Sequence, residues 1–403
     1  MIMSLRGLKF VSCVLGYLLF LVSCTSVNQP KKEMLDLVND RLAKATEQTE
    51  AMAFSLKDSV GRLPKTFEHG KLETSDSHWW CSGFFPGVLW YLYENNPDET
   101  LKKLAIEYSE RVKKEQFTTD NHDIGFIIFC SYGNAYRLLG ESSYKDVILQ
   151  AAHSLSTRFV EKTGLIRSWN SEEGQIVIID NMMNLEMLMW AALNSDSPEL
   201  KKMAMSHADR TMKEHFREDY SSYHLLYYDT ETGKCLDKKT VQGYADESAW
   251  ARGQAWGLYG YTMMYRMTKE ERYLEQAENI AHFILSHPNL PKDMIPYWDF
   301  NAPNIPNEER DASAAAVMAS AFIELSQYIS DKDFSEKTLL AAEEIIKTLS
   351  SSEYFAEKGT NGNFILKHSV GFKGVNSEVD VPLTYADYYY IEALMRYKKM
   401  FMN

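Results

Sequence analysis

Apolar residues recur about every 3.6 positions along most of the chain, which predicts helices with one apolar face. Neighbouring segments are separated by short polar joints such as 95–98 and 195–198, where Asn, Asp, Ser and Pro favour turns and helix starts. The pattern therefore predicts paired helices. They lie near residues 33–54, 83–96, 98–116, 124–139, 143–160, 180–195, 198–217, 247–268, 270–287, 310–330, 332–350 and 382–401.

One helix of each predicted pair is more apolar than its partner, as 124–139 is compared with 143–160. This asymmetry predicts an inner and an outer ring, so six hairpins would close into an all-α barrel. A solenoid of stacked hairpins is the alternative, although no fixed-period sequence repeat is visible. In a barrel the longer loops would collect at one end. These loops are 66–82, 161–179, 218–246, 288–309 and 351–381.

The N-terminus has the pattern of an export signal. Arg6 and Lys9 precede an apolar run at 10–22 that is shorter than the roughly 20 residues of a membrane-spanning helix. The run ends at Leu21-Val22-Ser23-Cys24, which resembles a bacterial lipobox. We expect a signal peptide at 1–23, a lipidated Cys24, a polar tether at 24–32 and one catalytic domain at 33–403. The alternative is a cleaved signal in which Cys24 is incidental.

This pattern predicts an exported lipoprotein that contacts a membrane only through its lipid anchor, on the outer membrane. Residues 25–27 lack the acidic run expected for surface export, which favours the periplasmic face. The formal charge of −13 argues against nucleic acid as a partner, because binding phosphates needs a basic face. It does not exclude an acidic sugar, which needs only a local cation.

Aromatic residues make up 13% of the chain, a share that suits either large helical cores or sugar-stacking clefts. Three cysteines remain for the folded domain, namely Cys81, Cys130 and Cys235. Their wide spacing fits neither a zinc site nor a disulfide framework. We therefore expect small core residues, or at most one disulfide, and no metal or organic cofactor.

Two aspartates stand where predicted inner helices begin, in His122-Asp123-Ile124-Gly125-Phe126 and in Ile178-Ile179-Asp180-Asn181. Each could simply cap its helix. The two would, however, lie at the same end of a barrel, and repulsion and burial at a shared cavity raise the pKa of a carboxyl group. The pair therefore predicts acid/base chemistry, either glycoside hydrolysis by two carboxylates or another protonation coupled to water attack.

The densest cluster of candidate residues is 240–257, TVQGYADESAWARGQAWG, with a helix expected to begin near Asp246. Arg252 lies between Trp250 and Trp256, which suits bidentate recognition of a sugar carboxylate beside aromatic faces. Core packing is the alternative for both tryptophans.

Two further segments enter the same loop system. His224 precedes a strand-like stretch at 225–229 and could face Gln242, although a lone histidine is more often structural. Trp80, in HWWCSGFFPG, could be a sugar platform or a lid on the core.

Six blocks together resemble family 88 of the glycoside hydrolases, the unsaturated glucuronyl hydrolases. The blocks are WCSGFFPGVLWYLYE, HDIGF, IIDNMMNLEML, SSYH, TVQGYADESAWARGQAWGLYGY and DVPLTYADYYYIEALMR. The resemblance implies an (α/α)6 barrel without metal or organic cofactor. It also implies that the substrate is a lyase-generated oligosaccharide, whose terminal 4,5-unsaturated uronate is hydrated and released as a keto sugar.

The resemblance also implies roles for individual residues. Asp180 is expected to be the general acid/base and Asp123 its carboxylate partner, which keeps the pKa of Asp180 raised. The expected substrate contacts are His122, His224, Gln242, Arg252 for the carboxylate, and Trp80, Trp250 and Trp256 as aromatic walls.

A Ser-x-Gly-x-Lys pattern, Ser369 to Lys373, resembles the sulfate-binding segment of members that act on glycosaminoglycan disaccharides. A solvated loop is the alternative. We therefore expect chondroitin, hyaluronan or heparin fragments as substrates. The rival functions are an unsaturated rhamnogalacturonyl hydrolase acting on pectin fragments and a non-catalytic glycan-binding lipoprotein.

Overall fold

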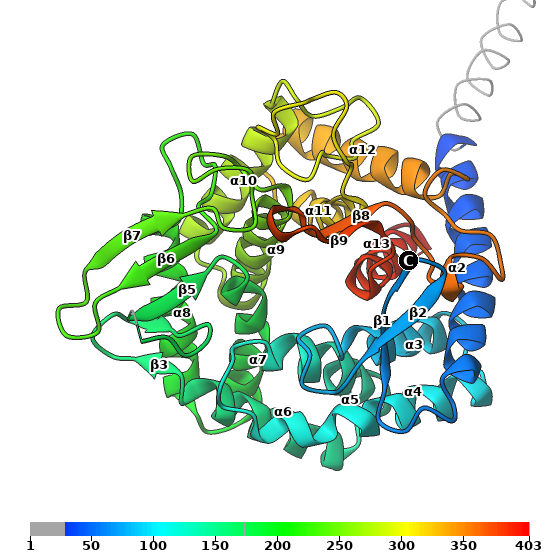
Figure 1. The fold of residues 1–403 in the computed structure, drawn as a ribbon, viewed down its shortest axis with the longest axis horizontal. Coiled ribbons are helices and arrows are strands. Elements are labelled where there is room, and N and C mark those ends of the chain that lie inside the picture. The colour runs from blue at the N-terminus through cyan, green and yellow to red at the C-terminus, as the bar shows by residue number, and fades with distance from the viewer. Residues whose placement is uncertain (1–28, 173, 403) are drawn as a thin grey trace, which may run out of the picture.

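The computed structural model describes residues 29–172 and 174–402 (Figure 1). All predicted helical segments are present. They are α2 (Gln29–Ser55), α3 (Phe84–Asn95), α4 (Glu99–Val112), the π-helix η2 (Gly125–Gly133) continued by α5 (Asn134–Leu139), α6 (Ser142–Ser156), α7 (Asn181–Asn194), α8 (Pro198–Glu214), α9 (Ala251–Thr268), α10 (Glu271–Ser286), α11 (Ala312–Leu325), α12 (Lys332–Leu349) and α13 (Thr384–Met402).

Several predicted helix boundaries are wrong, including the end of α11, which lies at Leu325 and not near 330. Helix α2 begins at Gln29 and includes the end of the expected tether, whereas α9 begins at Ala251, not near Asp246. The signal peptide and Cys24 lie outside the described residues. In the part of the chain described, no helix is long and apolar enough to cross a membrane.

The helices form two concentric rings (Figure 1). In the inner ring α3, η2, α7, α9, α11 and α13 each contact the next, and α13 returns to α3. The outer ring consists of α2, α4, α6, α8, α10 and α12. This closure confirms the all-α barrel and excludes the stacked solenoid.

The inner helices are buried on every side, which explains why their sequences are more apolar. Every residue of α11 is buried, while its partner α12 buries one face. Small residues also let inner helices approach closely. A Cβ atom on Gly125 of η2 would lie 2.4 Å from Oδ1 of Asn184 in α7, so only glycine fits there.

Short antiparallel strands occupy most of the long loops, and the stretch expected near 225–229 is the strand β6. The strands are β1 (Leu63–Glu68) with β2 (Lys71–Ser75), β3 (Phe159–Val160) with β4 (Leu165–Ile166), β5 (Gln175–Ile178) with β6 (Leu225–Tyr228) and β7 (Cys235–Lys239), and β8 (Ser369–Phe372) with β9 (Ser377–Val381). They gather at the end of the barrel where the inner helices α7, α9, α11 and α13 begin.

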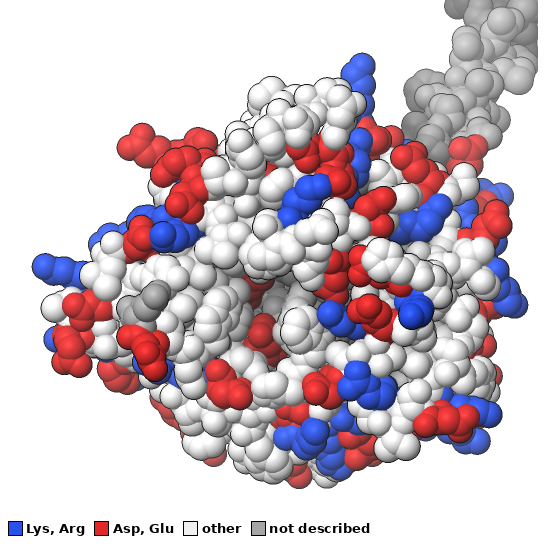
Figure 2. All heavy atoms as spheres, viewed as in Figure 1, with Lys and Arg blue, Asp and Glu red and all other residues white. Residues whose placement is uncertain are grey.

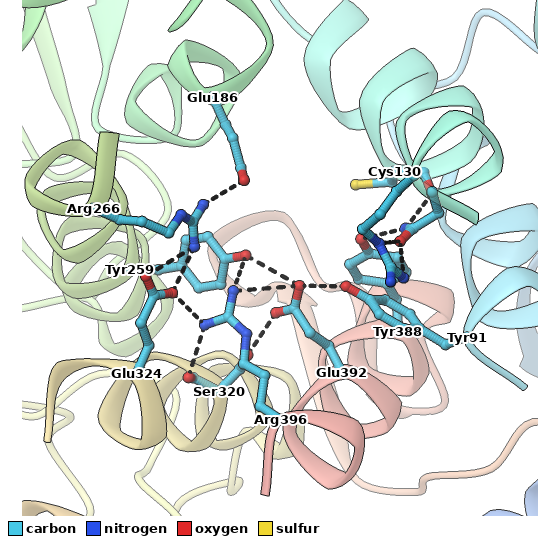
Figure 3. Close-up of polar contacts among 12 residues, drawn as sticks. Tyr91, Cys130, Glu186, Tyr259, Arg266, Ser320, Glu324, Tyr388, Glu392 and Arg396 are labelled. Carbon is cyan, nitrogen blue, oxygen red and sulfur yellow. Dashed lines mark hydrogen bonds and ion pairs between the residues drawn. The ribbon is translucent and has the colours of Figure 1, made fainter. Parts of the chain in front are cut away.

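A polar network ties the inner helices together further along their length (Figure 3). One oxygen of Glu392 accepts hydrogen bonds from the hydroxyls of Tyr91, at 2.8 Å, and Tyr259, at 3.1 Å, and the other accepts from Ser320 at 2.5 Å. In the same network the side chain of Arg266 forms ion pairs with Glu186 and Glu324. Because these buried groups satisfy one another, they stabilise the ring and need no ligand.

Cys81 and Cys130 are buried, Cys235 is half-buried, and all three are free thiols. The prediction of small core residues is thus confirmed for Cys81 and Cys130.

Candidate active site

A cavity of about 230 Å³ opens between the loops at the strand-bearing end of the barrel. Figure 2 shows this face hollowed near its centre, with acidic side chains visible in the hollow. The cavity is lined by Trp79, Trp80, His122, Asp123, Trp169, Ile178, Asp180, Gln242, Arg252, Gly371, Phe372, Val375, Ser377, Glu378 and Tyr385. It thus brings together six of the predicted site residues, including both aspartates. A larger cavity of about 430 Å³ lies at the polar network, where the carboxylates already have partners.

Asp180 holds an unpartnered carboxyl group inside the barrel. It follows β5 and precedes the first residue of α7, but its side chain makes no capping hydrogen bond. Its Oδ2 atom is buried without a hydrogen-bond partner in the described chain, and Nε2 of His224 lies 3.7 Å away. Burial raises the pKa of Asp180 to about 6, against the opposing effect of the Arg252 charge. The helix-capping interpretation is therefore wrong for this residue.

Asp123 is the second carboxyl group of the cavity, just before η2. Burial, followed by the charge of Asp180, raises the pKa of Asp123 to about 8. Burial is the first cause of the raised pKa of Asp180 as well, and the repulsion between the two carboxylates acts on both groups. Because coupled groups titrate as a unit, the pair holds about one proton between pH 6 and pH 8.

Hydrogen bonds fix the tautomer of His122, which is buried and kept neutral because burial lowers its pKa. Oδ1 of Asn184 accepts from the backbone N–H of Phe126 at 2.8 Å, so its amide nitrogen faces Nδ1 of His122 at 3.3 Å. Nδ1 must therefore accept, so Nε2 carries the proton, and this nitrogen lies 3.3 Å from Oδ1 of Asp123. The close packing of Asn184 against Gly125 holds this arrangement.

His224 is buried beside Asp180 and does not line the cavity. Burial lowers the pKa of His224 to about 3, so the ring is neutral. It packs edge-on against Trp250, with ring centroids 4.9 Å apart.

Arg252 lies in the cavity wall, but its guanidinium group is already occupied. Nη1 contacts Asp311 at 3.2 Å and the carbonyl of Val370, while Nη2 donates to Gln242 at 3.1 Å and to the carbonyl of Gly371 at 2.7 Å. The terminal nitrogens of Arg252 are thus not free to bind a sugar carboxylate in the bidentate manner that was expected. Arg252 instead anchors β8 and Gln242, and it contributes its positive charge to the cavity.

The aromatic walls differ from those predicted. Trp250 and Trp256 are buried beneath the cavity and pack against Arg252 and Phe126, respectively. Trp80 does line the cavity, as predicted. Four further aromatic residues, Trp79, Trp169, Phe372 and Tyr385, were missed. The doubled tryptophan at 79–80 was the available signal for Trp79, whose side chain is 40% exposed.

The two side chains of the predicted sulfate segment are not among the residues that line this cavity, and their role in binding sulfate stays a prediction. The hydroxyl of Ser369 is fully buried in β8, and Lys373 is paired with Glu309; neither residue lines the cavity. The backbone of this hairpin turns Gly371 and Phe372 toward the cavity instead. In the described part of the chain, no cluster of His, Cys, Asp and Glu could hold a metal ion.

A closed barrel of helical hairpins with two coupled carboxyl groups and aromatic walls in one end cavity has the architecture of a carbohydrate-active hydrolase. The family model described as Glycosyl Hydrolase Family 88 matches residues 55–399, so the chain belongs to that family. The predicted family, the (α/α)6 barrel and the glycoside hydrolase class are thereby confirmed.

Similar proteins carry names consistent with this family. An unsaturated glucuronyl hydrolase of Formosa agariphila is 39% identical and is aligned over 99% of this chain and 100% of its own length. An unsaturated chondroitin disaccharide hydrolase of Streptococcus agalactiae is 31% identical over 94% of this chain and 97% of its own. The crystal structure of an unsaturated glucuronyl hydrolase specific for heparin is 47% identical, with a TM-score of 0.88, over 91% of this chain and 98% of that one.

Proposed function

We propose that this enzyme hydrates the 4,5 double bond of the unsaturated uronic acid at the non-reducing end of lyase-generated glycosaminoglycan oligosaccharides. The observation that carries the proposal is the buried carboxyl group of Asp180, whose Oδ2 atom has no hydrogen-bond partner in the described chain and which lines one cavity with the second buried carboxyl group, Asp123. Burial raises the pKa of both groups, so a proton is held near neutral pH. The similarity to enzymes named for glucuronyl and chondroitin disaccharide substrates supports the substrate class.

One residue can perform both proton transfers of this reaction. Asp180 donates its proton to C4, so positive charge develops at C5, next to the ring oxygen. Water adds at C5 and returns a proton to the Asp180 carboxylate, which restores the catalyst. The resulting hemiketal opens, and the hemiacetal left at C1 releases the second sugar. The net change is the addition of one water molecule.

The other cavity residues position the ring and adjust the charge. Asp123, held by His122, orients the unsaturated ring and keeps one proton in the pair. The buried positive charge of Arg252 compensates for the negative charge of the uronate carboxylate, although its terminal nitrogens, which already have partners, do not form a bidentate hydrogen bond with that carboxylate. Trp80 and Gln242 provide a stacking face and a polar edge.

Substitution of Asp180 by Asn tests the function. The wild-type enzyme should remove the ultraviolet absorbance of the conjugated uronate in chondroitin, hyaluronan or heparin disaccharides, and Asp180→Asn should lower this rate by at least about 10⁴-fold, because one group acts as both acid and base. Activity confined to pectin fragments would favour the rhamnogalacturonyl alternative. Binding without absorbance loss, with equal affinity in the variant, would favour a binding protein.

We further propose that the chain is exported and anchored through a lipid on Cys24 to the periplasmic face of the outer membrane. The lipobox-like sequence at 21–24 supports this proposal. Labelled palmitate should enter the wild-type protein but not Cys24→Ser, and external protease should leave the protein intact in whole cells. Equal labelling of the two proteins would contradict the anchor, and cleavage in whole cells would contradict the periplasmic face.

A further inference from the structure

Glu378 of β9 places a third carboxylate in the cavity, and the mechanism above does not use it. Its side chain is 14% exposed and lines the cavity with Gly371 and Tyr385. One oxygen, Oε1, lies 3.3 Å from Nζ of Lys65 in β1. The described residues give the other oxygen, Oε2, no hydrogen-bond partner, and it packs beside Gly371, where an added Cβ would be 2.8 Å away.

The backbone is strained in a way that keeps Glu378 in this position. Glu378 has φ of +56°, Asp380 on the same strand has φ of +57°, and Asn376, which precedes the strand, has φ of +53°. A left-handed conformation is unfavourable for a residue other than glycine. Such strain persists at ligand-binding segments when contacts with the surrounding structure hold the residue in place. Here the ion pair with Lys65 is such a contact. A carboxylate is thus held beside an anionic substrate site despite a conformational cost.

The position of Glu378 identifies the part of the substrate it would meet. The unsaturated ring is the chain end, so it enters first and reaches Asp180, while the second sugar stays nearer the rim. The rim consists of exposed residues such as Trp79, Val375 and Ser377. Glu378 directly follows the rim residue Ser377 and precedes the buried end of its strand, which places it next to the rim. Its partner Lys65 lies near the rim as well, because Nζ of Lys65 is 4.8 Å from the ring centroid of Trp79.

We infer that the Glu378–Lys65 pair recognises the second sugar of the substrate, an inference that rests on the proposed hydration activity. Oε2 accepts a hydrogen bond from a hydroxyl, amide or amine N–H of that sugar, and its charge disfavours a sulfate at this wall. Lys65 neutralises Glu378 in part, because its charge lowers the pKa that burial raises. The pair is thus a specificity element for the leaving sugar.

The test compares kcat/KM for disaccharides that differ only in sulfation of the second sugar. Glu378→Gln removes the charge but keeps the shape, whereas Glu378→Gly removes the charge and also the backbone strain, so at least one should fold. Both should raise the sulfated-to-unsulfated ratio of kcat/KM about tenfold, as expected for one like-charge contact in a partly solvated site. Asp380→Asn is the matched control, because Asp380 is 55% exposed, lies on the same strand and does not line the cavity.

The control should leave the ratio unchanged. Wild-type turnover with an unaltered ratio in both Glu378 variants would overturn the assignment to Glu378 while leaving the hydration activity in place. Absence of wild-type turnover on every disaccharide would overturn the proposed function, and with it this inference.

Discussion

Asn184 controls the orientation of the His122 hydrogen bonds, and replacing it by Asp should reverse them. The two side chains have the same shape, and Asp can still accept from the backbone N–H of Phe126. A carboxylate cannot donate to Nδ1 of His122, 3.3 Å away, so that nitrogen would take the proton. Nε2 would then face Oδ1 of Asp123 with a lone pair, and the favourable contact between Nε2–H and this carboxyl oxygen would be lost.

The size of the effect follows from that single contact. A polar contact to a neutral carboxyl group contributes about 0.5–1.5 kcal/mol, so kcat/KM of Asn184→Asp should fall by roughly 2- to 10-fold. Nitrogen-15 NMR of the histidine rings should show Nε2–H for His122 in the wild-type protein and Nδ1–H in the variant. Asn184→Gln, which retains the amide donor, is the comparison that separates altered hydrogen bonding from altered packing. A wild-type His122 already protonated at Nδ1 would refute the reasoning.

The remaining predictions concern the carboxyl pair, the polar network and the rim. Wild-type kcat/KM should fall about tenfold per pH unit above about pH 8, where the carboxyl pair loses its last proton. In Asp123→Asn this decline should move toward pH 6, because Asp180 then titrates alone. A decline at the same pH in both proteins would contradict the coupling of the two carboxyl groups. Glu392→Leu leaves three hydroxyls without their acceptor, whereas Arg396 keeps its ion pair with Glu324, so urea denaturation should show a loss of about 1–3 kcal/mol in unfolding free energy, and a loss below about 0.5 kcal/mol would contradict this account. Trp79→Ala should raise KM about tenfold through lost stacking, whereas the exposed Phe117→Ala should not; equal KM values would exclude Trp79 from the substrate site.

The barrel was predictable because its helices carry their own signals. The paired periodicity and the excess of small apolar residues in 310–330 correspond to the fully buried α11. The start of α9 was misplaced because Asp246 has the residue type of a helix cap, yet its Oδ1 accepts from the backbone N–H of Thr240 in a turn before the helix. The local sequence does not reveal whether an aspartate caps a helix or accepts a hydrogen bond within a turn.

The acidic pair was predictable for a similar reason, since both aspartates begin inner helices at one end. Arg252 was misjudged because its partners, Asp311 and the carbonyls of β8, are distant in sequence. The same applies to Ser369, whose hydroxyl is buried by hairpin packing. Glu378 gave no signal, because its direction depends on a left-handed backbone that residue type does not predict.

The most direct test of the central claim follows the proton that Asp180 delivers. The reaction is run in D2O with an unsaturated glycosaminoglycan disaccharide, quenched early and read by NMR. Hydration predicts that the released keto sugar carries deuterium at C4, at a rate that falls by about 10⁴-fold in Asp180→Asn. Released uronate that still carries its 4,5 double bond at the early quench would instead show attack at the anomeric carbon and contradict the account.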